Sequence, residues 1–180
     1  MPASESAETP LRVGLSPAAA DPSTGITSSI VVGGIANTLM AASGHDVGQS
    51  LYEPNLIHEA QRLIRVAHKK GGEIPIPKDV VVAKSFSKDA EAYVRGVDEV
   101  QSDEMILDIG PLTAAKYATM IQHAGTVIWN GPVGVFEFKN FATGTRAIAD
   151  AIEISHAFSI AGGGDTLAAI DQLSVSDVVS

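Results

Sequence analysis

The segment SIAGGGDTLAAI, residues 159–170, gives the clearest indication of the architecture. An apolar run, Ala157–Ala161, leads into the three glycines Gly162–Gly164, and a small amphipathic run, Leu167–Leu173, follows them. This order predicts a buried strand, a glycine-rich turn and a helix. Such a turn exposes backbone N–H groups at the N-terminus of the helix, where these groups and the helix dipole favour an anion. Glycine lets the backbone approach that anion closely and adopt positive φ angles.

Asp165 and Thr166 stand at the start of this helix and have side chains suited to a phosphate site. Asp165 can cap the helix or hold a divalent cation, and Thr166 can donate its hydroxyl to a phosphate oxygen. The same residues also fit a plain helix cap after a tight turn. Three adjacent glycines are more than a cap needs, and this favours the phosphate.

The composition of the whole chain bounds the class of protein. The 180 residues are 45% hydrophobic and 18% charged, with a formal net charge of −9, which is typical of one globular domain. The negative charge argues against nucleic acid and anionic membranes as partners. The absence of cysteine excludes disulfides, thiolate catalysis and cysteine-ligated zinc. No apolar run reaches the length of a membrane span and no signal-peptide pattern is present, so we expect a cytoplasmic location.

Apolar strands and helices alternate along most of the chain. Strands are predicted at 26–32, 80–83, 105–109, 126–129 and 157–161, and helices at 33–42, 52–70, 111–124, 143–154 and 167–173. The alternation predicts an α/β fold, a parallel sheet of buried strands with helices on both faces. Residues 1–25 show no sustained period and form a flexible or divergent N-terminal segment, which leaves 26–180 as the domain. Residues 84–103 are expected to form a surface excursion. The last apolar run, 175–179, has the pattern of a strand.

Three glycine-bearing turns follow predicted strands: Gly33-Gly34, Asn130–Gly134 and Gly162–Thr166. Ligands of parallel α/β sheets bind at the carboxyl ends of the strands, so we expect these turns to converge on one pocket. None of them has the G-x-G-x-x-G spacing or a glycine followed by Lys-Ser or Lys-Thr, which argues against a nicotinamide dehydrogenase or a Walker-type ATPase. Glu137 fits either a solvated loop acid or an acceptor for ribose hydroxyls.

Two long motifs resemble the phosphoglycerate kinase family: VIWNGPVGVFEFKNF at 127–141 and AFSIAGGGDTLAAID at 157–171. Residues 32–52 and 105–110 are also similar, so the resemblance runs from about Ile26 to Ser180. It implies the C-terminal, nucleotide-binding, Rossmann-like three-layer domain of a phosphotransferase with a carboxyl group as acceptor. That enzyme transfers a phosphoryl group between 1,3-bisphosphoglycerate and ADP, with Mg²⁺, in glycolysis.

The resemblance implies a role for each residue of the glycine-rich turn. Gly162, Gly163, Gly164, Asp165 and Thr166 would meet the phosphates of ATP or ADP. Asp165 would also hold Mg²⁺, and Gly163 and Gly164 would stand at the catalytic positions.

The other two turns receive roles from the same resemblance. Asn130, with Gly131 and Pro132 behind it, would lie near the transferred phosphate. Glu137 would meet the ribose. Gly33 and Gly34 would lie against the adenine.

The chain also departs from the family pattern. Val32 stands where the family usually has a further glycine, and its side chain is expected to narrow the adenine slot. The phosphoglycerate-binding domain and the lysine-bearing nucleotide segment have no counterpart, and the chain ends before the next glycine-rich turn. We therefore expect a domain truncated at both ends that binds nucleotide but is inactive alone, and that meets 3-phosphoglycerate or 1,3-bisphosphoglycerate only if the missing domain is supplied. The alternatives are a non-catalytic nucleotide-binding module that pairs with a separate chain, and a truncated product without function.

Overall fold

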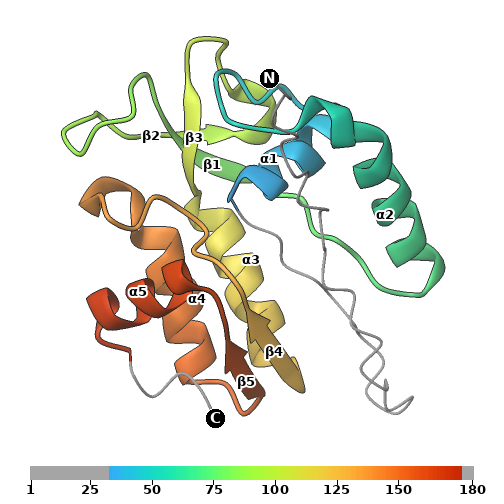
Figure 1. Cartoon of the computed structure of the whole chain (residues 1–180), viewed down its shortest axis with the longest axis vertical. Coiled ribbons are helices and arrows are strands. Elements are labelled where there is room, and N and C mark those ends of the chain that lie inside the picture. Colours follow the sequence, from blue (N-terminus) through green and yellow to red (C-terminus); the bar gives the residue numbers. More distant parts are fainter. Residues whose placement is uncertain (1–32, 176–180) are drawn as a thin grey trace, which may run out of the picture.

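The computed structural model describes residues 33–175 (Figure 1). The predicted segment 1–25, the predicted strand 26–32 with Val32, and residues 176–179 of the predicted strand-like end lie outside the described residues. The elements in chain order are α1 (Gly33–Ala42), α2 (Ile57–Lys69), β1 (Asp79–Ala83), β2 (Tyr93–Gly96), β3 (Met105–Ile109), α3 (Pro111–Gln122), β4 (Thr126–Trp129), α4 (Thr143–Glu153), β5 (Phe158–Ala161) and α5 (Gly164–Leu173), with short 3-10 turns at Pro54–Leu56, Val97–Glu99 and Lys139–Phe141.

The strands form two small sheets, one of three strands in the order β2-β1-β3 and one of two strands, β4-β5. The α/β class is confirmed. As predicted, β4 and β5 pair in parallel, and their register places Ile128 beside Ile160. The three-stranded sheet is antiparallel, so the prediction of a parallel sheet is wrong there. A parallel pair needs a crossover connection, usually a helix, whereas the segment between β1 and β3 contains only β2 and a 3-10 turn. β2 and β3 both run opposite to β1 and flank it on either side.

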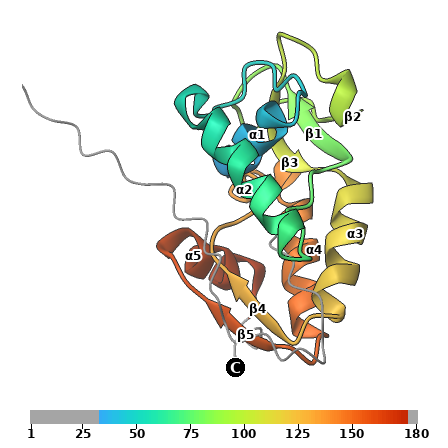
Figure 2. The same cartoon turned by 90° about the vertical axis from the view of Figure 1, so that its right-hand side faces the viewer.

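The β4–β5 pair packs against helices on one side. Trp129 and the half-buried Val127 meet residues of α3, α4 and α5 in the largest core cluster, which also contains Tyr117 and Ile148. Figure 2 shows α3 and α4 on that side of the pair. The prediction that both faces are covered is wrong for the described residues, because one face of the pair exposes large apolar side chains, those of Ile128, Phe158 and Ile160. Both strands carry apolar residues at positions of both faces, so the sequence does not reveal which face the helices cover.

The helices begin and end near the predicted residues. A 3-10 turn that starts at Pro54 precedes α2, so this helix begins at Ile57 rather than at Tyr52. The start of α3 is capped by a residue of another element, since the carboxylate of Asp79 accepts hydrogen bonds from the N–H groups of Leu112 (3.0 Å) and Thr113 (2.7 Å). None of the helices between residues 33 and 175 is both long and apolar enough to cross a bilayer.

Glu104 links β2 to β3 through a buried carboxylate. The side chain is fully buried and accepts hydrogen bonds from Nη2 of Arg95 (2.9 Å) and from the N–H of Gln101 (3.0 Å). The hydrogen bond from Arg95 is the main cause that lowers the pKa of Glu104.

We expect Glu104→Gln to lower the free energy of unfolding by about 1–3 kcal/mol, because one buried donor loses its acceptor. Asp103→Asn is the control: Asp103 pairs with Lys84 at 2.8 Å, but both side chains are exposed. The loss of this surface pair should cost less than about 1 kcal/mol. Urea denaturation of the two variants checks the contrast, and equal losses would contradict it.

Candidate nucleotide-binding site

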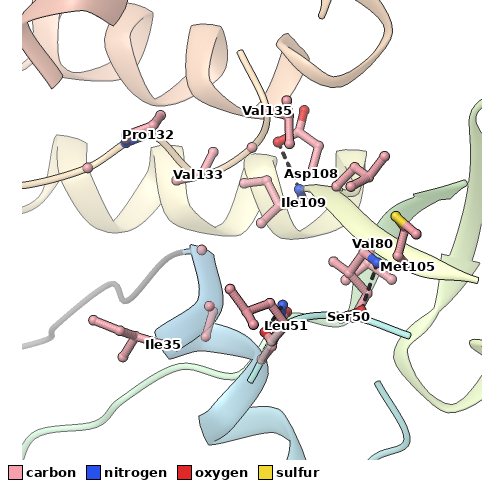
Figure 3. Close-up of a pocket in the computed structure, with 18 of the residues that line it drawn as sticks. Ile35, Ser50, Leu51, Val80, Met105, Asp108, Ile109, Pro132, Val133 and Val135 are labelled. Atoms are coloured by element: carbon pink, nitrogen blue, oxygen red, sulfur yellow. Dashed lines mark hydrogen bonds between the residues drawn. The ribbon is translucent and has the colours of Figure 1, made fainter. Parts of the chain in front are cut away.

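A cavity of about 650 Å³ lies between α1, the end of β3 and the turn after β4. Its wall includes Gly33 and Gly34, Asn130–Gly134, and Asp165, so parts of all three predicted turns meet at one place. Figure 3 shows Ile35 of α1 on one side, Pro132 and Val133 on the other, and Asp108 and Ile109 at the end of β3. The rest of the wall is mostly apolar and includes Met40, Leu51, Pro77, Val80, Phe86, Met105, Leu107 and Val135.

The turn after β4 is held to its surroundings by hydrogen bonds from its own backbone. The N–H of Gly131 donates to Oγ1 of Thr166 (2.7 Å), and the N–H of Val135 donates to the carbonyl of Leu107 (2.8 Å). Oγ1 of Thr145 accepts from the N–H groups of Val133 and Gly134, at 3.2 Å each. These amides are therefore occupied within the protein, and Asn130 is the residue of the turn whose side chain remains for a ligand.

Of the predicted phosphate-binding turn, Gly162–Thr166, only Asp165 lies on the cavity wall. Gly163 has φ +92°, and a Cβ atom at this position would lie 2.9 Å from Oδ1 of Asn130. The turn therefore needs glycine there and places Asn130 beside it. The next residues open α5, whose first amides have no partner within a helix. Gly162, Gly163, Gly164 and Thr166 are not part of the cavity wall.

Thr166 is fully buried. Its Oγ1 accepts the hydrogen bond from Gly131 and so joins α5 to the turn after β4. Within this structure the residue connects two of the predicted turns.

Asp165 is exposed and lies on the cavity wall at the first turn of α5. It fits the ligand set of Mg²⁺, which is usually held by one or two carboxylates together with phosphate oxygens and waters. No cluster of three or more His, Asp or Glu side chains suited to a metal exists among residues 33–175, so a complete all-protein cage is not found there. A cation at Asp165 would need the oxygens of a bound phosphate as further ligands.

Glu137 is one of the predicted site residues that do not line the cavity. It is exposed, follows the buried Phe136 and is not on the cavity wall. The carbonyl of Phe136 accepts a hydrogen bond from Nε2 of Gln172 in α5 (3.1 Å), which fixes the chain beside Glu137.

Asp108 is a residue of the cavity wall that the sequence did not single out as a site. Its side chain is 1% exposed, with Oδ1 accepting from the N–H of Ile109 (2.9 Å) and Oδ2 from the N–H of Gly144 (2.7 Å). Burial raises the pKa of Asp108 to about 7, and the two backbone hydrogen bonds act against this rise. A single acid in the apolar strand MILDI is the signal that marks it in the sequence.

Electrostatically the cavity is unusual for a site that would hold phosphates. Among the described residues of its wall, the ionisable side chains are those of Asp108 and Asp165, and none is Lys or Arg. Within this part of the chain, an anion would therefore depend on backbone dipoles and on a bound cation.

Comparison with known proteins identifies the family of the chain. The model of the family described as "Phosphoglycerate kinase" matches residues 24–180. The solved phosphoglycerate kinase of Coxiella burnetii is 48% identical with a TM-score of 0.83, and the match covers 85% of this chain and 39% of that one. For the phosphoglycerate kinase of Pyrococcus horikoshii OT3 the identity is 28%, the TM-score 0.66, and the coverage 79% of this chain and 36% of that one. The chain thus spans less than half the length of these two structures, and it belongs to the phosphoglycerate kinase family.

Proposed function

We propose that the chain binds ADP or ATP with Mg²⁺ in the cavity between α1, β3 and the turn after β4. The observation that carries the proposal is the meeting of Gly33-Gly34, Asn130–Gly134 and Asp165 on one wall. In this arrangement the phosphates lie at the N-terminus of α5, where Asp165 holds the cation. Gly33 and Gly34 lie against the adenine, and Glu137 accepts hydrogen bonds from the ribose. Membership of the phosphoglycerate kinase family supports the same ligands.

The reaction we propose for the complete enzyme is phosphoryl transfer between 1,3-bisphosphoglycerate and ADP, a step of glycolysis in the cytoplasm. In this reaction we propose Gly163 and Gly164 as the catalytic residues. Phosphoryl transfer depends on positioning and on cations that stabilise charge on the moving group. The described cavity wall has no Lys or Arg, so we propose that this chain alone binds nucleotide without turnover and that 3-phosphoglycerate requires a further domain.

We expect Asp165→Ala to weaken the binding of ADP in the presence of Mg²⁺ by at least about tenfold, measured as Kd by calorimetric titration. Removal of Mg²⁺ with a chelator should weaken binding to the unmutated chain by a similar factor, because the carboxylate acts through the cation. Asp171→Ala is the matched control, since Asp171 is an exposed aspartate of the same helix away from the cavity wall. Equal Kd values for both variants would overturn the role of Asp165. A folded, unmutated chain that gives no heat with MgADP would overturn the proposed function.

A further inference from the structure

Asp108 lies where three elements meet: the end of β3, the N-terminus of α4 and the turn after β4. Its carboxylate accepts the N–H of Gly144 in the first turn of α4 at 2.7 Å. A Cβ atom at Gly134 would overlap Oδ1 of Asp108, and so would a Cβ atom at Gly144. The carboxylate thus occupies the space that side chains at both positions would need.

The same end of α4 holds the turn through a second contact. Thr145, the residue after Gly144, accepts hydrogen bonds from the amides of Val133 and Gly134. Asp108 anchors Gly144, and Thr145 anchors the turn. The carboxylate therefore acts on the turn in two ways, by direct contact with Gly134 and through the backbone of α4.

We propose that Asp108 is the positioning residue that sets the place of the Asn130–Gly134 turn on the cavity wall, and through this turn the place of Asn130. The inference rests on the proposed function, since it concerns how the nucleotide-binding cavity is shaped. Asp108 acts through the backbone of Gly134 and Gly144.

Asp79 provides a matched comparison within the same molecule. It is also a buried carboxylate that accepts the amides at the start of a helix, here Leu112 and Thr113 of α3. A Cβ atom at Gly110 would overlap it, as one at Gly134 would overlap Asp108. Asp79 is not on the cavity wall. A residue that only caps a helix should therefore behave like Asp79.

The test compares Asp108→Asn with Asp79→Asn in the full chain, at a temperature where both variants are folded. Asparagine keeps the size of the side chain but places an NH₂ group opposite one of the two backbone donors. Both variants should unfold at lower urea concentration. Only Asp108→Asn should raise the Kd for MgADP, by about tenfold or more, while Asp79→Asn stays within about twofold of the unmutated chain. A Kd for Asp108→Asn within twofold of that of the unmutated chain would overturn the inference. An equal increase of the Kd for MgADP in both variants would also overturn it.

A second readout does not depend on a ligand and separates this inference from the proposed function. Amide hydrogen exchange, followed by NMR, reports on the hydrogen bonds of Val133 and Gly134 to Thr145. Asp108→Asn should speed exchange at these two amides by about tenfold or more relative to Asp79→Asn. This result would support the positioning role even if the unmutated chain bound no MgADP. Unchanged exchange at both amides would refute the role even if MgADP bound well.

Gly134→Ala keeps the inference testable if Asp108→Asn does not fold. The added methyl group would push the turn away from an intact carboxylate, since it would also lie 2.6 Å from the carbonyl oxygen of Phe141. We expect the same weakened MgADP binding and faster exchange at Val133. Gly125→Ala is its control, because a Cβ atom there has no atom within 4 Å. The same behaviour in both glycine variants would overturn the inference.

Discussion

Gly144→Ala should lower the free energy of unfolding by about 2–6 kcal/mol, because it overpacks a buried contact and breaks a hydrogen bond to a buried carboxylate. The new methyl group would overlap Oδ1 of Asp108 and lie 2.5 Å from Cγ1 of Ile109. Overpacking of this kind costs about 1–3 kcal/mol, and loss of the hydrogen bond from Gly144 to the buried carboxylate adds about 1–3 kcal/mol. Urea denaturation measures the loss as a shift of the midpoint with unchanged slope.

Two controls tie this loss to the carboxylate. Gly125→Ala lies in open space and should change the free energy of unfolding by less than about 1 kcal/mol. Asp108→Ala should cost less in the Gly144→Ala chain than in the unmutated chain, because the overlap is relieved in the double variant. Purely additive losses would mean that Gly144 and Asp108 do not meet as the structure indicates.

The second large effect is a dependence of stability on pH that comes from Asp108. Its pKa is about 7 in the folded chain, against an ordinary value of 3.8. Between these two values the folded chain keeps the proton while the unfolded chain has lost it, so stability falls as pH rises through this window. At about 1.4 kcal/mol for each pH unit, this group alone should lower the free energy of unfolding by about 2–3 kcal/mol between pH 5 and pH 8.

The difference between the unmutated chain and Asp108→Asn isolates this contribution. Asparagine does not titrate. Between pH 5 and pH 8 the free energy of unfolding should therefore fall by about 2–3 kcal/mol less in the variant than in the unmutated chain. Glu104 acts in the opposite direction and at lower pH, because its pKa is lowered: its contribution is present above its ordinary pKa of 4.5 and is lost in acid. Parallel pH profiles for the two chains would mean that Asp108 is ionised throughout this range.

Local sequence predicted the elements that form the site. Alternating apolar runs and glycines set α1, α3, β4, α4, β5 and α5 close to their observed ends, because hydrophobic periodicity and helix-ending residues act within a few positions. The glycine-rich turns were also predicted to converge, and Gly33, Gly34, Asn130 and Asp165 do lie on one cavity wall. The motifs that resemble phosphoglycerate kinase led to the family to which the chain belongs.

The pairing of these elements and the side chains that they bury depend on how the whole chain packs. The antiparallel order β2-β1-β3 depends on how the chain returns between strands, which no local pattern records. The exposed face of Ile128, Phe158 and Ile160 depends on where the helices pack.

Asp108 makes the same point for the site. In the sequence it is one acid in the apolar strand MILDI, and its partner Gly144 lies 36 residues away. Its burial, its raised pKa and its contacts with Gly134 and Gly144 exist only once β3, the turn after β4 and α4 are packed together. Periodicity and turn chemistry act between near neighbours, whereas desolvation of a carboxylate requires contacts from distant parts of the chain.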